Sequence, residues 1–439
     1  MIENIANISA QIFKIIIISS ILFLTPRIVF MFLGFGKRLT YHPKKHKNSK
    51  FAILIPARDE SNIIEELLMA LSKQHYPKEA FDVYIIVKNS NDKSINLANK
   101  YGYIPLVCEN QTCKGDALDF VIKHIYKNNL QYDSFVIFDA DNVPTKTFLK
   151  EINKAYLCGY DIGIGYRNSK NWNDGWVATA TGLTFSLINT LSNKGRTKRG
   201  RNCIFSGTGY FISKKVIDKF ESWPFKTLTE DYEISLYATL NNLKTCYVEN
   251  AEFFDEQPKT LKVSSKQRVR WVKGFTQANN LYTWKIFKAI FTDKKNRLAK
   301  FEQVFSVLPV IVMAASTIIY LLLNIGLAIA SLIANISATP YFLNALKILL
   351  ITYILLVIFT EIQFVAEAKR INVNVLSVIT TSLLNPFYIF LYVPIGIKAL
   401  LSKNIGWSKI EHGAKLKNES ENLEEVYEDD EAREANKNA

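Results

Sequence analysis

The sequence predicts an α/β domain with a mostly parallel sheet, inserted between transmembrane helices. Hydrophobic residues make up 49% of the 439 residues although the net charge is +14, and the long apolar runs lie toward the two ends of the chain. The charged middle alternates short apolar strands with helical patterns. Such alternation implies parallel strands with helices on both faces of the sheet, and a ligand crevice beyond the carboxyl ends of the strands.

The elements expected in the middle of the chain begin with the strand 51–57. Further expected strands cover 81–87, 104–109 and 135–138, and expected helices cover 60–74, a stretch from Ser94, and 114–127.

The first apolar run, residues 9–35, is long enough to cross a bilayer. A signal peptide is the alternative, but no basic leader or small-residue cleavage site is evident. The dense basic segment 36–50 follows directly, and basic flanks mark the cytosolic side. We therefore expect an uncleaved anchor with its N-terminus outside.

Three apolar segments, 304–335, 341–366 and 374–401, each exceed the roughly 20 residues that a membrane helix needs. Their linkers predict three crossings, which would leave the end of the chain outside. The segment that follows residue 401 is nevertheless strongly basic and belongs inside by the same charge rule. Either 374–401, broken at Asn385-Pro386 and Pro394, is partly interfacial or re-entrant, or the rule is overridden; we expect a cytosolic tail.

The composition argues against several classes of site and of protein. The five cysteines are scattered and odd in number, which supports neither a zinc site nor a disulfide framework. The basic excess fits anionic lipid or a phosphate cleft, and no nucleic-acid motif is visible. A polytopic transporter would explain the apolar helices, but no ATP-binding P-loop occurs.

Two carboxylates, Asp139 and Asp141, directly follow the expected strand at 135–138. An Asp-x-Asp at this place can offer oxygen ligands to a hard divalent cation that also holds a diphosphate. A turn or helix cap is the alternative reading, because Asp and Asn favour both.

Two later motifs carry further chemistry. Glu230 and Asp231 start an expected helix, where compensation of the helix dipole is the simpler explanation. Gln267, Arg270 and Trp271 lie in a basic helical segment that could also be a membrane-surface helix with an aromatic anchor.

The order of the motifs resembles the family 2 glycosyltransferases, in particular the processive branch with cellulose, chitin and hyaluronan synthases. The motifs are PARDE, NSND, KGDAL, DADN, FSGTGYF, TED and QRVRW, followed by membrane segments, and they cover residues 50–275. This resemblance implies a GT-A-like nucleotide-sugar transferase domain.

The resemblance also implies a role for each matching residue. Ala57 and Glu60 would line a uridine pocket, Lys114 would approach the diphosphate, and Asp139 and Asp141 would bind it through Mg²⁺ or Mn²⁺. Asp231 would be the general base with Glu230 in support. Gln267, Arg270 and Trp271 would hold the acceptor end and the pyrophosphate. Trp407 resembles the tryptophan of a cytosolic loop that caps the active site in hyaluronan and chitin synthases.

One position departs from the pattern. Lys88 stands where the family usually has an acidic residue after the second strand, and Asp92 matches only a later acidic position. Asn89 or a backbone group could replace the uridine contact, and a non-catalytic variant stays open.

The implied domain order is an anchor, a cytosolic catalytic domain, interfacial helices, a membrane region and a partly disordered tail. Their ranges are 1–36, 37–274, 275–300, 301–402 and 403–439. A second interfacial helix is expected within 171–200, where two tryptophans precede a basic end.

The leading expectation is a multi-pass plasma-membrane synthase that extends a β-glycan from a UDP-sugar and exports it. The compact chain resembles small bacterial β-glucan synthases, which implies UDP-glucose and a mixed-linkage (1,3;1,4)-β-glucan or cellulose. Its expected partners are the donor, the growing polysaccharide, the bilayer and an accessory export subunit, with no nucleic acid. Open alternatives are transfer of one sugar to a polyprenyl phosphate and synthesis of an amino-sugar polymer such as poly-N-acetylglucosamine or a hyaluronan-like chain.

Overall fold

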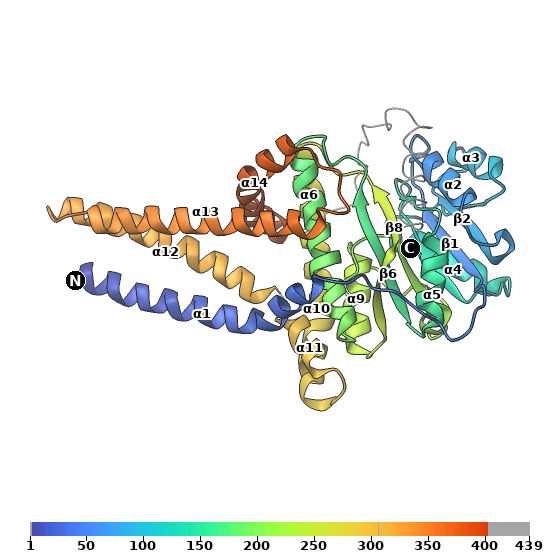
Figure 1. Cartoon of the computed structure of the whole chain (residues 1–439), viewed down its shortest axis with the longest axis horizontal. Helices are drawn as coiled ribbons and strands as arrows, with labels where there is room; N and C mark the ends of the chain where they lie inside the picture. The colour runs from blue at the N-terminus through green and yellow to red at the C-terminus, as the bar shows by residue number, and fades with distance from the viewer. Residues whose placement is uncertain (1, 306, 403–439) are drawn as a thin grey trace.

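The computed structural model describes residues 2–305 and 307–402, and its α/β domain is built on one eight-stranded sheet (Figure 1). The strand order across the sheet is β3-β2-β1-β4-β7-β6-β8-β5. The strands are β1 (Phe51–Pro56), β2 (Phe81–Val87), β3 (Ile104–Val107), β4 (Ser134–Ile137), β5 (Val143–Pro144), β6 (Ile162–Ser169), β7 (Tyr210–Ser213) and β8 (Thr245–Asp255).

The sheet is mostly parallel, as the sequence predicts. β1 pairs in parallel with β2 and β4, β2 with β3, and β6 with β8. β7 lies antiparallel between β4 and β6, and β5 is antiparallel to β8. Every residue of β1 is buried, which explains its unbroken apolar sequence: both faces of a central parallel strand are covered.

Helices cover both faces of the sheet. One apolar cluster joins β1 and β2 to α2 and α5, and the other joins β1 and β4 to α4 and α9. The helices of the α/β domain are α2 (Ile64–Ser72), α3 (Ser94–Lys100), α4 (Lys114–Lys127), α5 (Phe148–Leu157), α6 (Trp176–Ser186), α7 (Lys194–Lys198), α8 (Lys214–Ile217) and α9 (Glu230–Leu240), with a 3₁₀ turn at Lys78–Ala80 and a π-helical segment at Leu187–Asn193.

The remaining helices connect this domain to the membrane region (Figure 1). They are α1 (Ile2–Gly34), α10 (Leu261–Thr292), α11 (Arg297–Val304), α12 (Leu308–Ile333), α13 (Thr339–Glu367), α14 (Val375–Phe390) and α15 (Tyr392–Leu401). By length and composition, four segments of the described chain could cross a membrane: Ile2–Gly34, Arg297–Ile333, Thr339–Glu367 and Val375–Leu401. α1, α12 and α13 extend away from the sheet together.

The helices around the expected domain boundary differ from the sequence-based expectation. α10 is one continuous helix that contains both the QRVRW segment and residues 275–291, so the boundary expected at 274/275 falls inside it. α10 continues through Gly274, and the missing side chain there lets the helix approach Thr229, because an added Cβ would lie 2.6 Å from the Thr229 nitrogen.

The segment 171–200 is helical but mostly buried in protein. Trp172 is buried and donates its Nε1–H to Asn168 Oδ1 at 2.7 Å. Together α6, the π-helical segment and α7 form the layer between the sheet and α1, α13 and α14.

The last apolar segment is interrupted at Leu391 and not at Asn385-Pro386. Pro394 lacks the N–H that would bond to the Phe390 carbonyl, so the ladder stops there and Pro394 falls in the first turn of α15, where proline is tolerated.

Candidate active site

The candidate site lies at the carboxyl ends of β1 and β4, where the Asp139–Asn142 turn meets the loop before β7. The backbone N–H of Asp139 donates to Asn142 Oδ1 at 3.0 Å and to Thr208 Oγ1 at 2.8 Å. The Thr208 hydroxyl in turn donates to Asn142 Oδ1 at 2.5 Å, and both side chains are fully buried. Asn142 and Thr208 therefore fix the backbone from which the two aspartates project.

Lys114, the first residue of α4, ties this turn to α9. Its Nζ lies 2.7 Å from Asp139 Oδ1 and 3.2 Å from Glu230 Oε1, and it donates to the Gly207 carbonyl at 2.6 Å. Burial lowers the pKa of Lys114, but the carboxylates of Asp139 and Glu230 outweigh it and the pKa is raised overall. The lysine is therefore a fixed positive charge between the two acidic motifs.

The TED motif places two carboxyls at the N-terminus of α9. Asp231 accepts a hydrogen bond from the Gly207 N–H, and Glu230 is almost fully buried. Burial raises the pKa of both Glu230 and Asp231, while Lys114 works against this rise in each case. A carboxylate with a raised pKa is a better proton acceptor, which suits a general base.

α10 contacts the TED turn through residues that follow its QRVRW segment. Besides the Gly274–Thr229 approach, the Leu228 N–H donates to Gln277 Oε1 at 3.1 Å. Gln267, Arg270 and Trp271 are half-buried on this helix. The KGDAL, DADN, FSGTGYF and TED motifs thus meet through Lys114, Asp139, Gly207, Glu230 and Asp231.

Arg167 and Asp255 are part of this cluster although the sequence did not point to them. Arg167 Nε donates to Asp255 Oδ2 at 2.7 Å, and its Nη1 donates to the Ser206 carbonyl at 2.9 Å. Burial raises the pKa of Asp255, and the nearby charges of Asp141 and Asp139 add to the rise against the opposing effect of Arg167. The pair therefore lies within electrostatic reach of both metal-binding candidates.

The pairing of β6 with β8 is irregular just before Arg167. The β6–β8 pairing shifts between Gly165 and Tyr166, and such irregularities re-aim side chains near active sites. In sequence, Arg167 and Asp255 are each a charged residue near the end of an apolar strand.

The residues expected at a uridine pocket follow β1 and β2, two neighbouring parallel strands. Ala57 is buried and its N–H donates to the Ile86 carbonyl at 2.8 Å, whereas Glu60 is half-buried and Asn89 is exposed. Asp92 Oδ2 accepts from the Asp59 N–H at 3.2 Å, so this acidic residue links the two loops. Lys88 directly follows β2 and is half-buried.

A divalent cation fits the residues present. Asp139 and Asp141 project from one turn, and no cluster of three or more His, Cys, Asp or Glu ligands occurs in residues 2–305 and 307–402. Mg²⁺ is commonly held by one or two carboxylates plus substrate phosphates and waters, so two aspartates beside a diphosphate suffice.

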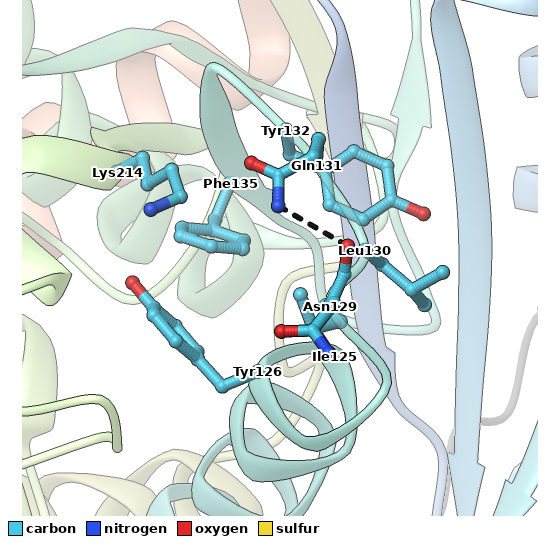
Figure 2. Close-up of a pocket in the computed structure, with 8 residues that line it drawn as sticks. All are labelled: Ile125, Tyr126, Asn129, Leu130, Gln131, Tyr132, Phe135 and Lys214. Carbon is cyan, nitrogen blue, oxygen red and sulfur yellow. Dashed lines mark hydrogen bonds between the residues drawn. The ribbon is translucent and has the colours of Figure 1, made fainter.

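Two other features lie apart from this cluster. Trp407 falls outside the described residues. A small pocket of about 50 Å³ is lined by Tyr126, Phe135, Lys214 and neighbouring residues (Figure 2). Phe135 is the second residue of β4, so this pocket lies toward the opposite end of that strand from Asp139.

Comparisons with known proteins agree with this geometry. Residues 48–274, just over half of the chain, match the family described as "Glycosyltransferase like family 2". The chain is 26% identical over 282 residues to the probable glycosyltransferase YdaM of Bacillus subtilis, covering 60% of this chain and 65% of that protein. It is 23% identical over 237 residues to a beta-monoglucosyldiacylglycerol synthase of Synechocystis, covering 51% and 47%.

A third relative is the probable glucomannan 4-beta-mannosyltransferase 14 of Arabidopsis thaliana, at 22% identity over 237 residues, covering 51% of this chain and 44% of that protein. The chain thus spans between about half and just under two thirds of these relatives' lengths.

Among solved structures, the mannosyltransferase PcManGT from Pyrobaculum calidifontis, in complex with GDP-Man and Mn²⁺, is similar in fold. Its TM-score is 0.57 at 14% identity, and the match covers 92% of this chain and all of that one. The α/β domain therefore has a GT-A-like fold, and the chain belongs to glycosyltransferase-like family 2.

Proposed function

We propose that this protein is a membrane-embedded inverting glycosyltransferase that moves a sugar from a nucleotide donor to an acceptor hydroxyl at the membrane. The observation that carries the proposal is the single connected cluster of Asp139, Lys114, Glu230 and Asp231. It puts a group able to hold a diphosphate beside a buried carboxyl able to accept a proton.

In the proposed reaction, Asp231 takes the proton of the acceptor hydroxyl as the hydroxyl oxygen attacks the anomeric carbon of the donor sugar. The bond from that carbon to the diphosphate breaks on the opposite face, so the configuration inverts. A positioned carboxylate base contributes about 10²–10⁴-fold in rate. Mg²⁺ or Mn²⁺ held by Asp139 and Asp141 would supply charge neutralisation for the departing diphosphate.

The other motif residues have supporting roles in this proposal. Arg270 has the planar fork that suits phosphate oxygens, and Lys114 adds a second positive charge on the donor side. Trp271 offers an apolar face for a sugar ring, while Gln267 lies one turn earlier on the same helix. Ala57, Glu60, Asn89 and Asp92 would receive the uridine of a UDP donor.

For the product, we propose a β-glycan made from UDP-glucose, extended processively and exported. Relatives with names such as glucomannan 4-beta-mannosyltransferase support a β-glycan product. Export would draw on a second copy or an accessory subunit, because within residues 2–305 and 307–402 α1 packs on α12 and α12 on α13 in an open row.

That open row favours a second candidate, transfer of a single sugar to a lipid acceptor that enters from the bilayer. A beta-monoglucosyldiacylglycerol synthase among the relatives supports this reading. A lipid acceptor needs only a lateral path to the site, whereas a polymer needs an enclosed channel.

The test uses purified full-length protein with Mn²⁺ or Mg²⁺ and radiolabelled UDP-glucose, UDP-N-acetylglucosamine or GDP-mannose in turn, in lipid vesicles. Label in a high-molecular-weight product that a glucanase degrades would establish β-glucan synthesis. Label in an organic-extractable lipid would establish the second candidate. If none of the donors gave a labelled product, the result would contradict the proposed activity.

A further inference from the structure

α14 presents apolar side chains outward and mostly polar side chains inward, whereas α15 buries the apolar Ile395 and Ala399. The buried residues of α14 are Ser377, Thr381, Ser382, Asn385, Pro386 and Tyr388. The exposed large apolar side chains of the two helices are Val375, Leu376, Ile379, Leu383, Phe387, Phe390, Val393, Ile397, Leu400 and Leu401. An apolar face of this size needs lipid around it. The contacts at the ends of the two helices determine how deep in the membrane this face lies.

The start of α14 is held by the α/β domain. The Asn374 N–H donates to Asn173 Oδ1 at 2.9 Å, and Asn173 Nδ2 donates to the Asn372 carbonyl at 3.0 Å. Asn173 lies between β6 and α6, so α14 begins beside the sheet.

The end of α14 returns to the same domain. The Tyr388 hydroxyl lies 2.7 Å from Thr181 Oγ1 of α6 and 2.8 Å from Ser264 Oγ of α10. Arg268, fully buried on α10, donates to the Tyr388 carbonyl at 3.0 Å, and its guanidinium carbon lies 3.9 Å from the centre of the Tyr388 ring.

α15 is also bound along α10. Val269 and Val272 of α10 pack on Ile395 and Ala399. One turn further on α10, Lys273 Nζ donates to the Ser402 carbonyl at 2.8 Å. Ser402, the last described residue, therefore contacts the helix that carries Arg270 and Trp271.

These helices differ from the other three candidate spans. In the most apolar 18-residue stretch of Val375–Leu401, a third of the residues are buried in protein. The corresponding share in the other three candidate spans is 6–12%. α14 lies beside the end of α13 nearest the sheet and does not run out with α12 and α13 (Figure 1). Its 16 residues span about 24 Å, less than the roughly 30 Å of a bilayer core.

We propose that α14 and α15 form a membrane-surface element that lies in the leaflet next to the catalytic domain, with its apolar face against the acyl chains of that leaflet. The chain then crosses the membrane three times, through α1, α12 and α13. Ser402 stays on the side of the catalytic domain, which resolves the conflict between a basic tail and an odd number of C-terminal crossings. It is also the side on which Trp407 would have to lie to reach the site.

The first test compares the full chain with an epitope tag after Ala439 and the same chain with the tag before Met1. Protease is added to intact cells and to permeabilised cells. The N-terminal tag should be digested in both, and the C-terminal tag only after permeabilisation. Digestion of the C-terminal tag in intact cells would overturn the proposal.

The second test measures depth. Nitroxide labels are placed at Leu383, Phe387 and Leu350 in turn, in a chain whose Cys113 and Cys158 are replaced by Ser. Leu383 and Phe387 are exposed and lie near the middle of Val375–Leu401, and exposed Leu350 near the middle of α13 serves as the deep reference. Oxygen and a water-soluble nickel complex should report Leu383 and Phe387 as shallower than Leu350. Equal depth at all three positions would overturn the proposal even if the tags agreed with it.

Discussion

The guanidinium carbon of Arg167 lies 3.6 Å from the centre of the Phe185 ring, and that ring meets the Trp271 ring edge-on at 5.8 Å. The same guanidinium binds Asp255 and the Ser206 carbonyl. One residue of β6 thus connects the loop that holds Asp231 to the tryptophan of α10. Arg167 therefore links the proposed base, Asp231, to the proposed acceptor platform, Trp271.

Arg167→Lys should lower kcat for transfer about tenfold and leave the KM for the donor nearly unchanged. Lysine keeps the charge but loses the planar contact with Phe185 and the forked hydrogen-bond donors of the guanidinium group. A cation–π contact contributes about 1–2 kcal/mol when desolvated. Steady-state kinetics of the purified variant measures both constants, with Arg199→Lys, an exposed position, as the control. A rise in donor KM at constant kcat would contradict this positioning role.

Asp231→Asn should reduce transfer by about 10²–10⁴-fold while binding of UDP stays close to wild type. Asparagine has a similar shape and can still meet the Gly207 N–H, but it cannot accept the proton. Initial rates and calorimetric binding of Mn²⁺-UDP measure the two effects, and Asp218→Asn, a surface carboxylate, is the matched control. Substantial remaining transfer would show that another group is the base.

Lys114→Gln should move the acidic limb of the kcat profile to higher pH. Transfer needs Asp231 deprotonated, so activity is present above the pKa of this carboxyl and is lost as pH falls through it. Burial already raises the pKa of Asp231, and Lys114 opposes the rise. Without the lysine the pKa goes up further. The profile is measured at saturating donor, so that weaker donor binding does not distort it. An unshifted acidic limb would show that Lys114 does not influence the pKa of the base.

Asp141→Asn should weaken binding of UDP in the presence of Mn²⁺ about tenfold or more, and should change binding without metal little. The loss of one carboxylate ligand removes a charge from the proposed cation site. Calorimetric titration with and without a chelator measures the difference, and Glu65→Gln at an exposed ion pair serves as the control. Equal affinities for Mn²⁺-UDP in both proteins would argue against a metal role.

The sequence was informative where a local rule governs the outcome. Buried parallel strands read as unbroken apolar runs, and the helices that begin at Lys114 and Ser94 start where the pattern predicts. The Asp-x-Asp, TED and QRVRW segments could be found because each is compact in sequence, and Lys114 then joins the first two in the fold.

Contacts between distant segments could not be predicted in the same way. The pairing of Arg167 with Asp255 joins residues 88 positions apart, and it depends on the register between β6 and β8. The glycine at position 274 of α10 is explained only by the close approach of Thr229, and the break at Leu391 lies where Pro394 removes a helical hydrogen bond and Arg268 binds the Tyr388 carbonyl. None of these relations has a periodic signature along the chain.

Gly195→Ala should destabilise the joint between α1 and the catalytic domain. A Cβ at position 195 would lie 1.9 Å from the Phe30 carbonyl oxygen, and one at Gly34 would lie 2.3 Å from the Thr190 carbonyl oxygen, so α1 and the α7 layer touch backbone to backbone. Overpacking of this kind costs about 1–3 kcal/mol.

The matched control is Gly326→Ala on α12, where an added Cβ meets nothing within 4 Å. The midpoint of thermal unfolding in detergent should fall for Gly195→Ala and stay constant for Gly326→Ala. Equal midpoints would mean that α1 is not held against α7 as closely as this contact requires, and the anchor would then be free to shift relative to the active site.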